Sequence, residues 1–362
     1  MKKKIIIICI AILITALVTT IILNFNNIFY KATNLKKTEN VEVFATINDT
    51  VTADSTWCGI FQLVWNDIKN DLANGQIHSS TPNTTVENLN QEDFTKDMIS
   101  DEYYYQIYGE KSPELKEIIE QAIMEKFNQT SSILDTIDWS KSENIIFYAM
   151  LYKKFEFYNK FDNLENDTFS NKYENIEYFG IDESSNNDLG NQVDVLFYNS
   201  QNSFAFLINT KTDDEVIIYK NPKGETFKQM YDNMNKQAEK YNGDKIFNDV
   251  DQLKIPKINI DLEKDYSELT NKIFTTNNIE HSQFKIENAL QSIKFNLDEE
   301  GGEIKSDVIF DTNWYTSGIN QEKEKKEPRY FYVDDTFVIF LREKGKELPY
   351  FAGRIDNITK FQ

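Results

Sequence analysis

The chain has 362 residues, 40% hydrophobic and 14% aromatic, which is enough to bury a large core in one or two domains. Its 12 glycines and 6 prolines are too few for collagen-like repeats or a proline-rich disordered chain. The formal charge of −20 argues against a nucleic-acid partner, because phosphate groups need Lys and Arg to neutralise them.

The two cysteines also restrict the chemistry. Cys9 lies in an apolar leader, so Cys58 is the one cysteine of the expected folded part. An intramolecular disulfide and a thiolate zinc cluster are therefore excluded there. We expect no cofactor and no bound metal.

The first residues predict a membrane anchor. Lys2–Lys4 precede the uncharged apolar run 5–23, which as a helix would nearly span the hydrocarbon layer of a bilayer. The lysines place the N-terminus in the cytoplasm and the bulk of the chain outside. No small-residue cleavage site follows, which favours an uncleaved signal-anchor (1–23) over a cleaved signal peptide followed by secretion. Residues 24–55, rich in Asn, Thr and Lys, then predict a polar tether.

The remaining residues, 56–362, predict one extracellular α+β domain. Apolar residues at helical spacing predict helices over 56–72, 113–134 and 225–241, and a further helix is expected over 265–274. Residues 144–161 predict one long buried strand. Two strands around a hairpin-like turn are predicted in 192–209, and two more strands in 333–355.

The stretch Phe295–Val308 has an unusual order of patterns. Phe295 and Leu297 alternate with polar residues, as in a strand, before two acids and two glycines. After the glycines an alternation resumes that places Gly302, Ile304, Ser306, Val308 and Phe310 on one side of an extended chain. The simplest interpretation is a hairpin turn between two strands. The polar stretch 311–329, with a charge run at 322–327, predicts a long exposed loop.

This order resembles the hinge and reactive-centre loop of the serpins, the serine protease inhibitor family. The family hinge reads roughly V-N-E-E-G-T-E-A-A-A, and residues 297–306 here read L-D-E-E-G-G-E-I-K-S. The hinge residues carried over from the resemblance are Glu299, Glu300, Gly301, Gly302, Glu303, Ile304 and Ser306.

Further blocks resemble serpins in the same order. Residues 144–161 look like the central strand of the serpin main sheet, roughly L-V-N-A-I-Y-F-K-G-x-W-x-x-x-F, with Tyr152, Lys154 and Phe161 matching. Residues 195–208 and 253–262 match two other serpin strand patterns. The most specific block is C-terminal, and its matching residues are Asp334, Phe337, Phe340, Arg342, Phe351, Gly353 and Arg354.

The resemblance covers residues 114–356 and implies a serpin-like fold, with helices packed around a large mixed β-sheet plus smaller sheets. It also implies an exposed loop at about 302–329. Upstream, too few residues remain for all the helices of a full serpin. The chain therefore looks like a divergent bacterial member with a shortened N-terminal part.

The function that the resemblance implies is protease inhibition. An extracellular serine or cysteine protease would cleave the loop, which would then insert into the main sheet as a new strand and trap the enzyme. Spacing from the hinge places the candidate scissile bond between Tyr315 and Thr316. Several departures from the family leave an alternative open: the bulk of Ile304 and Phe310, Gln291 in place of the usual histidine, and a longer loop before Val333. That alternative is a non-inhibitory serpin-like binding or structural ectodomain.

A hydrolase is the competing class. The acid pairs Glu299/Glu300 and Asp334/Asp335 have the residue types of a general acid and base. Adjacent residues on a strand point to opposite faces, however, so neither pair is expected to converge on one site. No Gly-rich phosphate loop or H-E-x-x-H motif is present. We therefore expect no enzyme activity.

Overall fold

The computed structural model describes residues 37–140, 142, 144–277, 283–304 and 327–362. Contacts divide the chain into two units, Met1–Lys37 and Thr38–Gln362, and the second unit contains all the described helices and strands. The predicted anchor 5–23 lies outside the described residues. Within the described ranges, no helix combines the length and apolar character that crossing a bilayer requires.

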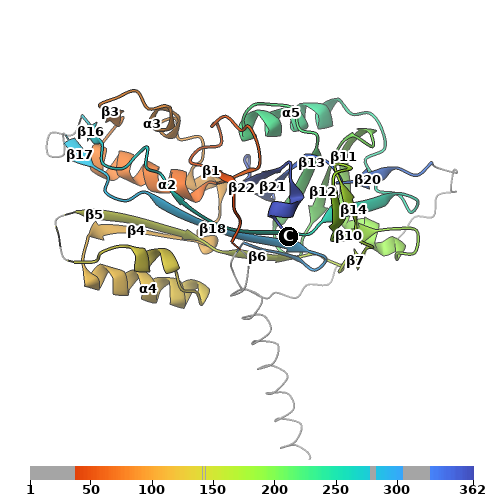
Figure 1. Cartoon of the computed structure of the whole chain (residues 1–362), viewed down its shortest axis with the longest axis horizontal. Helices are drawn as coiled ribbons and strands as arrows, with labels where there is room; N and C mark the ends of the chain where they lie inside the picture. Colours follow the sequence, from red (N-terminus) through yellow and green to blue (C-terminus); the bar gives the residue numbers. More distant parts are fainter. Residues whose placement is uncertain (1–36, 141, 143, 278–282, 305–326) are drawn as a thin grey trace, which may run out of the picture. The chain divides into compact units, whose positions relative to one another are not determined.

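Seven strands form the largest sheet, in the spatial order β1-β2-β22-β21-β13-β12-β11 (Figure 1). β1 and β2 are parallel and the other neighbours are antiparallel, so this sheet is mixed. The strand pairs predicted in 192–209 and 333–355 are present as β11–β12 and β21–β22. The strands are β1 (Glu42–Phe44), β2 (Ser55–Cys58), β11 (Val193–Ser200), β12 (Ser203–Asn209), β13 (Asp214–Lys220), β21 (Phe337–Glu343) and β22 (Phe351–Ile355).

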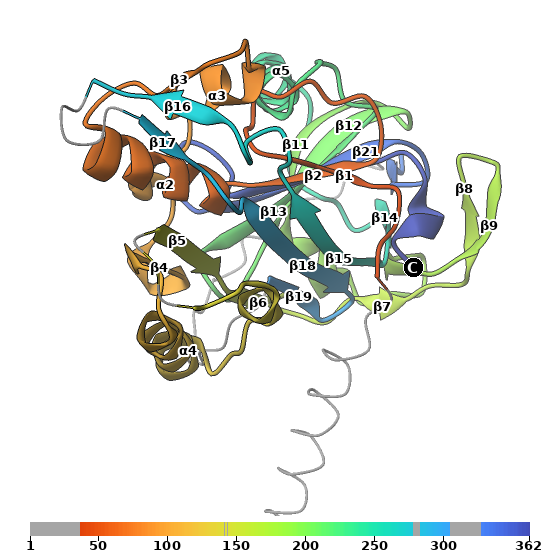
Figure 2. The ribbon, with the colours of Figure 1, turned by 60° about the vertical axis from the view of Figure 1, so that its left-hand side comes forward.

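A second sheet, here called the hinge sheet, contains the predicted hinge residues. It has four antiparallel strands in the order β15-β18-β19-β6 (Figure 2). Alternating burial along β18 places Gln291, Ile293, Phe295 and Leu297 on the core face. The strands are β15 (Ile258–Asp265), β18 (Leu290–Asp298), β19 (Gly301–Ile304) and β6 (Lys153–Glu156).

The strand predicted over 144–161 is interrupted. It consists of β5 (Ile145–Leu151) and β6, separated at Tyr152, whose backbone N–H donates to the carbonyl of Tyr103 (3.0 Å). β5 pairs with β4 (Tyr104–Glu110) and is only partly buried, contrary to the prediction of one buried strand. Two helices cover this pair from opposite faces, α2 (Ile60–Asp67) and α4 (Pro113–Phe127) (Figure 1).

The helix predicted over 113–134 ends at Phe127, because Asn128 adopts the left-handed conformation (φ +52°). A short 3₁₀ turn, η4 (Ser132–Thr136), follows it. The helix predicted over 225–241 is α5 (Phe227–Lys240), which packs on the seven-stranded sheet through Tyr231 and Phe340, with ring centroids 5.2 Å apart. The helix predicted over 56–72 begins later, at Ile60, after β2, and continues beyond α2 as a π-helical turn, Ile68–Ala73.

The remaining elements are smaller. A four-stranded sheet has the order β20-β14-β10-β7, a three-stranded sheet β17-β16-β3, and β8 and β9 form a separate hairpin. The region predicted as a helix over 265–274 contains no helix: it follows the end of β15 and leads into β16. The elements are β3 (His78–Ser79), α3 (Thr84–Leu89), β7 (Asp162–Asn163), β8 (Asp167–Phe169), β9 (Tyr173–Ile176), β10 (Tyr178–Ile181), β14 (Gln252–Pro256), β16 (Ile273–Thr275), β17 (Gln283–Lys285) and β20 (Tyr330–Tyr332).

Residues before Thr56, which the sequence assigns to a polar tether, belong in part to the folded unit. They supply β1, and the backbone N–H of Thr38 donates to the carbonyl of Asp261 in β15 (3.0 Å). Four apolar side chains are buried in this segment: Val43, Ala45, Ile47 and Val51. The folded unit therefore begins at Thr38 rather than at Thr56.

The buried side chains form two clusters. The main cluster lies between the hinge sheet and the seven-stranded sheet and also includes α2, α3 and α5. A second, small cluster lies under α4, on the outward face of β4 and β5, and its members are Leu115, Ile119, Ile123, Phe127, Leu134, Trp139, Tyr148 and Tyr152. α4 therefore packs on a small core of its own.

Candidate functional site

The predicted hinge forms a tight hairpin between β18 and β19. The backbone N–H of Glu300 donates to the Asp298 carboxylate (3.0 Å) and closes the turn. Gly301 has φ +146°, and a Cβ there would lie 2.3 Å from the carbonyl oxygen of Phe155. This position therefore requires glycine, both for its backbone conformation and for the close approach of β6.

β19 lies between β18 and β6 and pairs with both (Figure 2). Gly302 is opposite Leu297 on one side and Phe155 on the other, and Ile304 is opposite Lys153. Gly302 and Ile304 are both buried on the core face. A Cβ on Gly302 would lie 2.4 Å from the Phe155 ring, so this ring fills the space beside the glycine.

Glu299 fixes the start of the hairpin. Its carboxylate binds the ammonium of Lys257 (2.7 Å) and accepts a hydrogen bond from the Asn163 amide (3.1 Å). Desolvation acts to raise its pKa, but Lys257, a backbone hydrogen bond and the Asn163 amide together outweigh desolvation and lower the pKa of Glu299 to about 2. Its neighbour Glu300 binds Lys160 (2.7 Å) at the surface.

The acid pairs do not form catalytic pairs. Glu299 and Glu300 are engaged as described, and Asp334 binds Lys220 (2.5 Å) while Asp335 accepts a hydrogen bond from the Ser170 hydroxyl (2.7 Å). Each of these carboxylates thus has a structural partner, and the Lys160 ammonium also lies 3.5 Å from Glu299. Contrary to the expectation, neither pair lies within a strand: Glu299 and Glu300 form the turn between β18 and β19, and Asp334 and Asp335 lie between β20 and β21.

A buried ion cluster lies beneath the hinge sheet and was not predicted. Lys153, opposite Ile304, is fully buried, with its ammonium 2.9 Å from Asp214 and 2.7 Å from Glu343. The Tyr103 ring centroid is 3.5 Å from the same ammonium. Burial raises the pKa of Asp214, although Lys153 opposes this effect. The cluster joins the hinge sheet to the seven-stranded sheet, since Asp214 and Glu343 face each other at the ends of β13 and β21.

Sequence reasoning missed Lys153 because a lysine in a strand is usually exposed. The signal was its place in the serpin-like strand pattern quoted above, which has Phe where this chain has Lys153. The same serpin pattern has Gly at the position of Phe155. The inward alternation of Lys153 and Phe155 could therefore have identified both as buried.

Beyond β19 the neighbouring strands have free edges within the described part of the chain. β18 pairs with β19 only over Asn296–Asp298, and β5 pairs with β4 alone. Over residues 290–295, the edge of β18 that faces away from β15 therefore lacks a strand partner among the described residues, and so does the edge of β5 that faces away from β4. Ser306, Tyr315 and Thr316, the other predicted site residues, lie outside the described residues.

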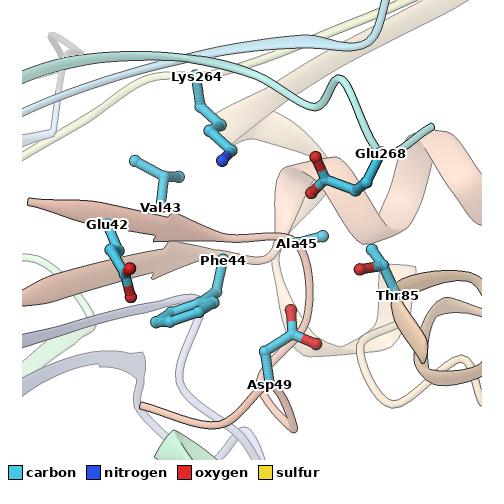
Figure 3. A pocket seen from close by; sticks show the side chains of 8 residues that line it. All are labelled: Glu42, Val43, Phe44, Ala45, Asp49, Thr85, Lys264 and Glu268. Atoms are coloured by element: carbon cyan, nitrogen blue, oxygen red, sulfur yellow. The ribbon is translucent and has the colours of Figure 1, made fainter. Parts of the chain in front are cut away.

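A separate cavity of about 250 Å³ lies at the end of β15 remote from the hinge (Figure 3). The side chains of Lys264, Glu268 and Asp49 point into it, and buried Val43 and Ala45 form part of its wall. Glu42 also lines the cavity, so carboxylates outnumber the ammonium group. Its lining is thus polar and charged, unlike a pocket for a hydrophobic ligand.

Comparison with known proteins identifies solved structures that are similar to this chain. No family model matches the chain, and no curated protein matches it. Among the solved structures it is similar to Serpin48, a serpin of the insect Tenebrio molitor, with 11% identity, 84% of this chain and 92% of that chain covered, and a TM-score of 0.46.

Two further similar structures are thyroxine-binding globulin with bound thyroxine. One has 13% identity, covers 67% of this chain and 64% of that chain, and has a TM-score of 0.37. The other, the human protein, has 9% identity and a TM-score of 0.40, with 81% of this chain and 95% of that chain covered. A serpin is thus among the solved structures to which the chain is similar, as the resemblance in sequence predicts. At such identities and TM-scores nothing follows about activity or ligands.

Proposed function

We propose that this protein is a serpin-like inhibitor of a serine or cysteine protease, acting through cleavage and insertion of the loop that follows β19. One observation carries the proposal. β19 already lies between β18 and β6 with both ladders in register, while the edges of β18 and β5 beyond it have no strand partner among the described residues. A strand that continued β19 would pair with both edges.

The register shows what an inserted strand would meet. Continued along β6 and β5, it places Ser306 opposite Leu151 and Val308 opposite Ala149. Continued along β18, it places the same two residues opposite Ile293 and Gln291. All these neighbours lie on the core face, so small or apolar inserted side chains fit and a charged one does not.

Insertion would stabilise the cleaved protein. Each new backbone hydrogen bond contributes about 1 kcal/mol net, and burial of Val308 and its apolar neighbours adds about 25 cal/mol per Å². Several residues would gain such bonds on both sides, so the cleaved form should unfold at a much higher temperature than the intact form.

The experiment compares thermal unfolding before and after limited proteolysis of the full-length protein by a chymotrypsin-like protease. Mass spectrometry identifies the cut, expected at Tyr315–Thr316, and any covalent complex with the protease. A large rise in melting temperature together with a covalent complex supports inhibition. A cleaved protein that melts at or below the intact one contradicts insertion.

A non-inhibitory binding ectodomain is the second candidate. The buried cluster at Lys153 favours it, because β6 is cross-linked to the seven-stranded sheet by ion pairs that strand movement would disturb. In that case a partner is captured through residues 311–329 without cleavage. Capture should then weaken in high salt and disappear when this stretch is deleted, and a pull-down at two salt concentrations tests both.

We also propose that residues 5–23 hold the chain at the cell membrane with the folded unit outside. The support is the uncharged run behind Lys2–Lys4. Cell fractionation followed by protease treatment of intact cells tests the proposal. Recovery of the whole chain in the soluble cytoplasm would contradict it.

A further inference from the structure

The core under α4 extends to the edge of the hinge sheet. Of its buried members, Tyr152 lies at the break between β5 and β6, directly beside β19. The turn η4, which follows α4, packs beside β18. The segment from α4 to η4 therefore crosses from β5 to β18 on the outward face, above the two unpaired strand edges.

One hydroxyl group connects this segment to the hinge strand. Tyr152 is 2% exposed, and its ring packs on Phe127 of α4 with centroids 5.9 Å apart. Its hydroxyl accepts a hydrogen bond from Nε2 of Gln129, just after α4 (2.5 Å), and donates to Oε1 of Glu303 in β19 (3.1 Å). Glu303 is further fixed by Asn296 of β18, whose side-chain oxygen accepts from the Glu303 backbone N–H (3.1 Å).

We propose that Tyr152 is a positioning residue that couples the hinge strand β19 to α4, so that α4 stays docked while Glu303 is in place and loosens when Glu303 is displaced. The effect of this coupling on loop entry rests on the proposed function, but the exchange experiment on the uncut protein does not. The hydroxyl serves both partners, so the loss of either partner changes the position of the other. Coupling of this kind acts equally in both directions.

The consequence concerns entry of the loop. A strand that continues β19 places residue 305 opposite Tyr152 and residue 307 opposite Met150, both on the outward face toward α4. The entering strand can therefore take this position only if the α4–η4 segment moves away from the edges of β5 and β18. Since α4 packs on its own small core, it can move without disturbing the main core.

The test measures amide hydrogen exchange in the uncut, full-length protein. Glu303→Ala should speed exchange at the end of α4 (residues 123–127) about fivefold, the effect of one net hydrogen bond. Gln129→Ala should speed exchange in β19 by a similar factor. The double variant should show no more than either single one, because both remove the same connection.

Two controls separate coupling from general loosening. Glu156→Ala removes an exposed carboxylate from the same outward face of β6 and should leave α4 unchanged. Glu303→Gln keeps an acceptor for the Tyr152 hydroxyl and should restore slow exchange in α4. If each variant affects only its own element, or if the double variant is additive, the coupling is absent and the proposal fails.

A second measurement separates this proposal from the proposed function. Tyr152→Phe keeps the ring on Phe127 and removes only the hydroxyl, so the cleaved variant should insert its loop about fivefold faster than the cleaved natural chain. An unchanged insertion rate overturns the coupling and leaves insertion intact. If the natural chain never inserts, the proposed function fails, and the exchange data on the uncut protein alone decide whether Tyr152 couples the two elements.

Discussion

At the scale of single residues, Gly301 joins two strands through a conformation that other residues rarely adopt. Gly301→Ala should destabilise the protein by about 2 kcal/mol or more, from strain at positive φ and a clash with the Phe155 carbonyl. Gly345→Ala is the control: its φ is +81°, but an added Cβ meets no atom within 4 Å. Urea unfolding should show the larger loss at Gly301, and equal losses would contradict the clash.

Glu299 gives a prediction about pH. Because its pKa is lowered in the folded state to about 2 from an ordinary value of 4.5, its contribution to stability is present above pH 4.5 and is lost as the pH falls toward 2. Glu299→Gln should cost about 1 kcal/mol at pH 7, and the difference from the natural chain should shrink in acid. A difference that persists unchanged at pH 2, in chemical unfolding, would show that the charge is not its origin.

Among these variants, we expect replacement of Lys153 to lower the free energy of unfolding most. Lys153→Met leaves Asp214 and Glu343 buried without a cation, at a cost of about 3–5 kcal/mol. Adding Asp214→Asn and Glu343→Gln should recover much of this loss. Lys154→Met, on the partly exposed outward face, is the control and should stay within about 0.5 kcal/mol in denaturant unfolding.

At the scale of elements, alternation and helical spacing predict those parts whose burial is regular. The pattern around Phe337 and Phe351 predicts β21 and β22, and Phe295 and Leu297 predict β18. The hairpin at Gly301 agrees with the simplest interpretation of two acids and two glycines between strands. In each case one face is buried along the whole element, so apolar residues recur regularly along its sequence.

Elements that depend on distant contacts could not be predicted in this way. At the strand break, the backbone N–H of Tyr152 donates to the carbonyl of Tyr103, a distant residue, whereas α4 ends at a local feature, the left-handed Asn128. The fold of residues 38–55 depends on the pairing of β1 with β2, which follows directly, and on the hydrogen bond from Thr38 to β15, far along the chain. The cluster at Lys153 is a tertiary feature, since its carboxylates come from two other strands.

The separate core of α4 predicts local stability. Ser112 caps α4 by accepting a hydrogen bond from the Leu115 N–H (3.1 Å), and Ser112→Ala should cost about 1 kcal/mol. Hydrogen exchange should rise about fivefold in 113–127 and stay unchanged in α5, because the two helices share no core cluster. Thr226→Ala, which removes the cap of α5, should give the reverse pattern. Equal effects on both helices would contradict separate cores.

At the scale of the whole molecule, two sheets enclose one main core, and the hinge lies in the smaller of them. One edge of the hinge strand is closed by β18 and the other by β6, while the buried ion pairs of Lys153 tie β6 to the larger sheet. Inhibition by insertion requires that the strand edges beyond β19 receive the loop after cleavage.

Hydrogen exchange at these edges tests that claim most directly. The amides of 290–295 in β18 and 145–151 in β5 are followed in the full-length protein before and after cleavage between residues 311 and 329. The account predicts that exchange slows in both segments after cleavage, as the new strand binds them. Ser306→Arg should abolish the slowing, because its side chain would face Leu151 and Ile293 in the core. Unchanged or faster exchange in the cleaved natural chain would contradict the account.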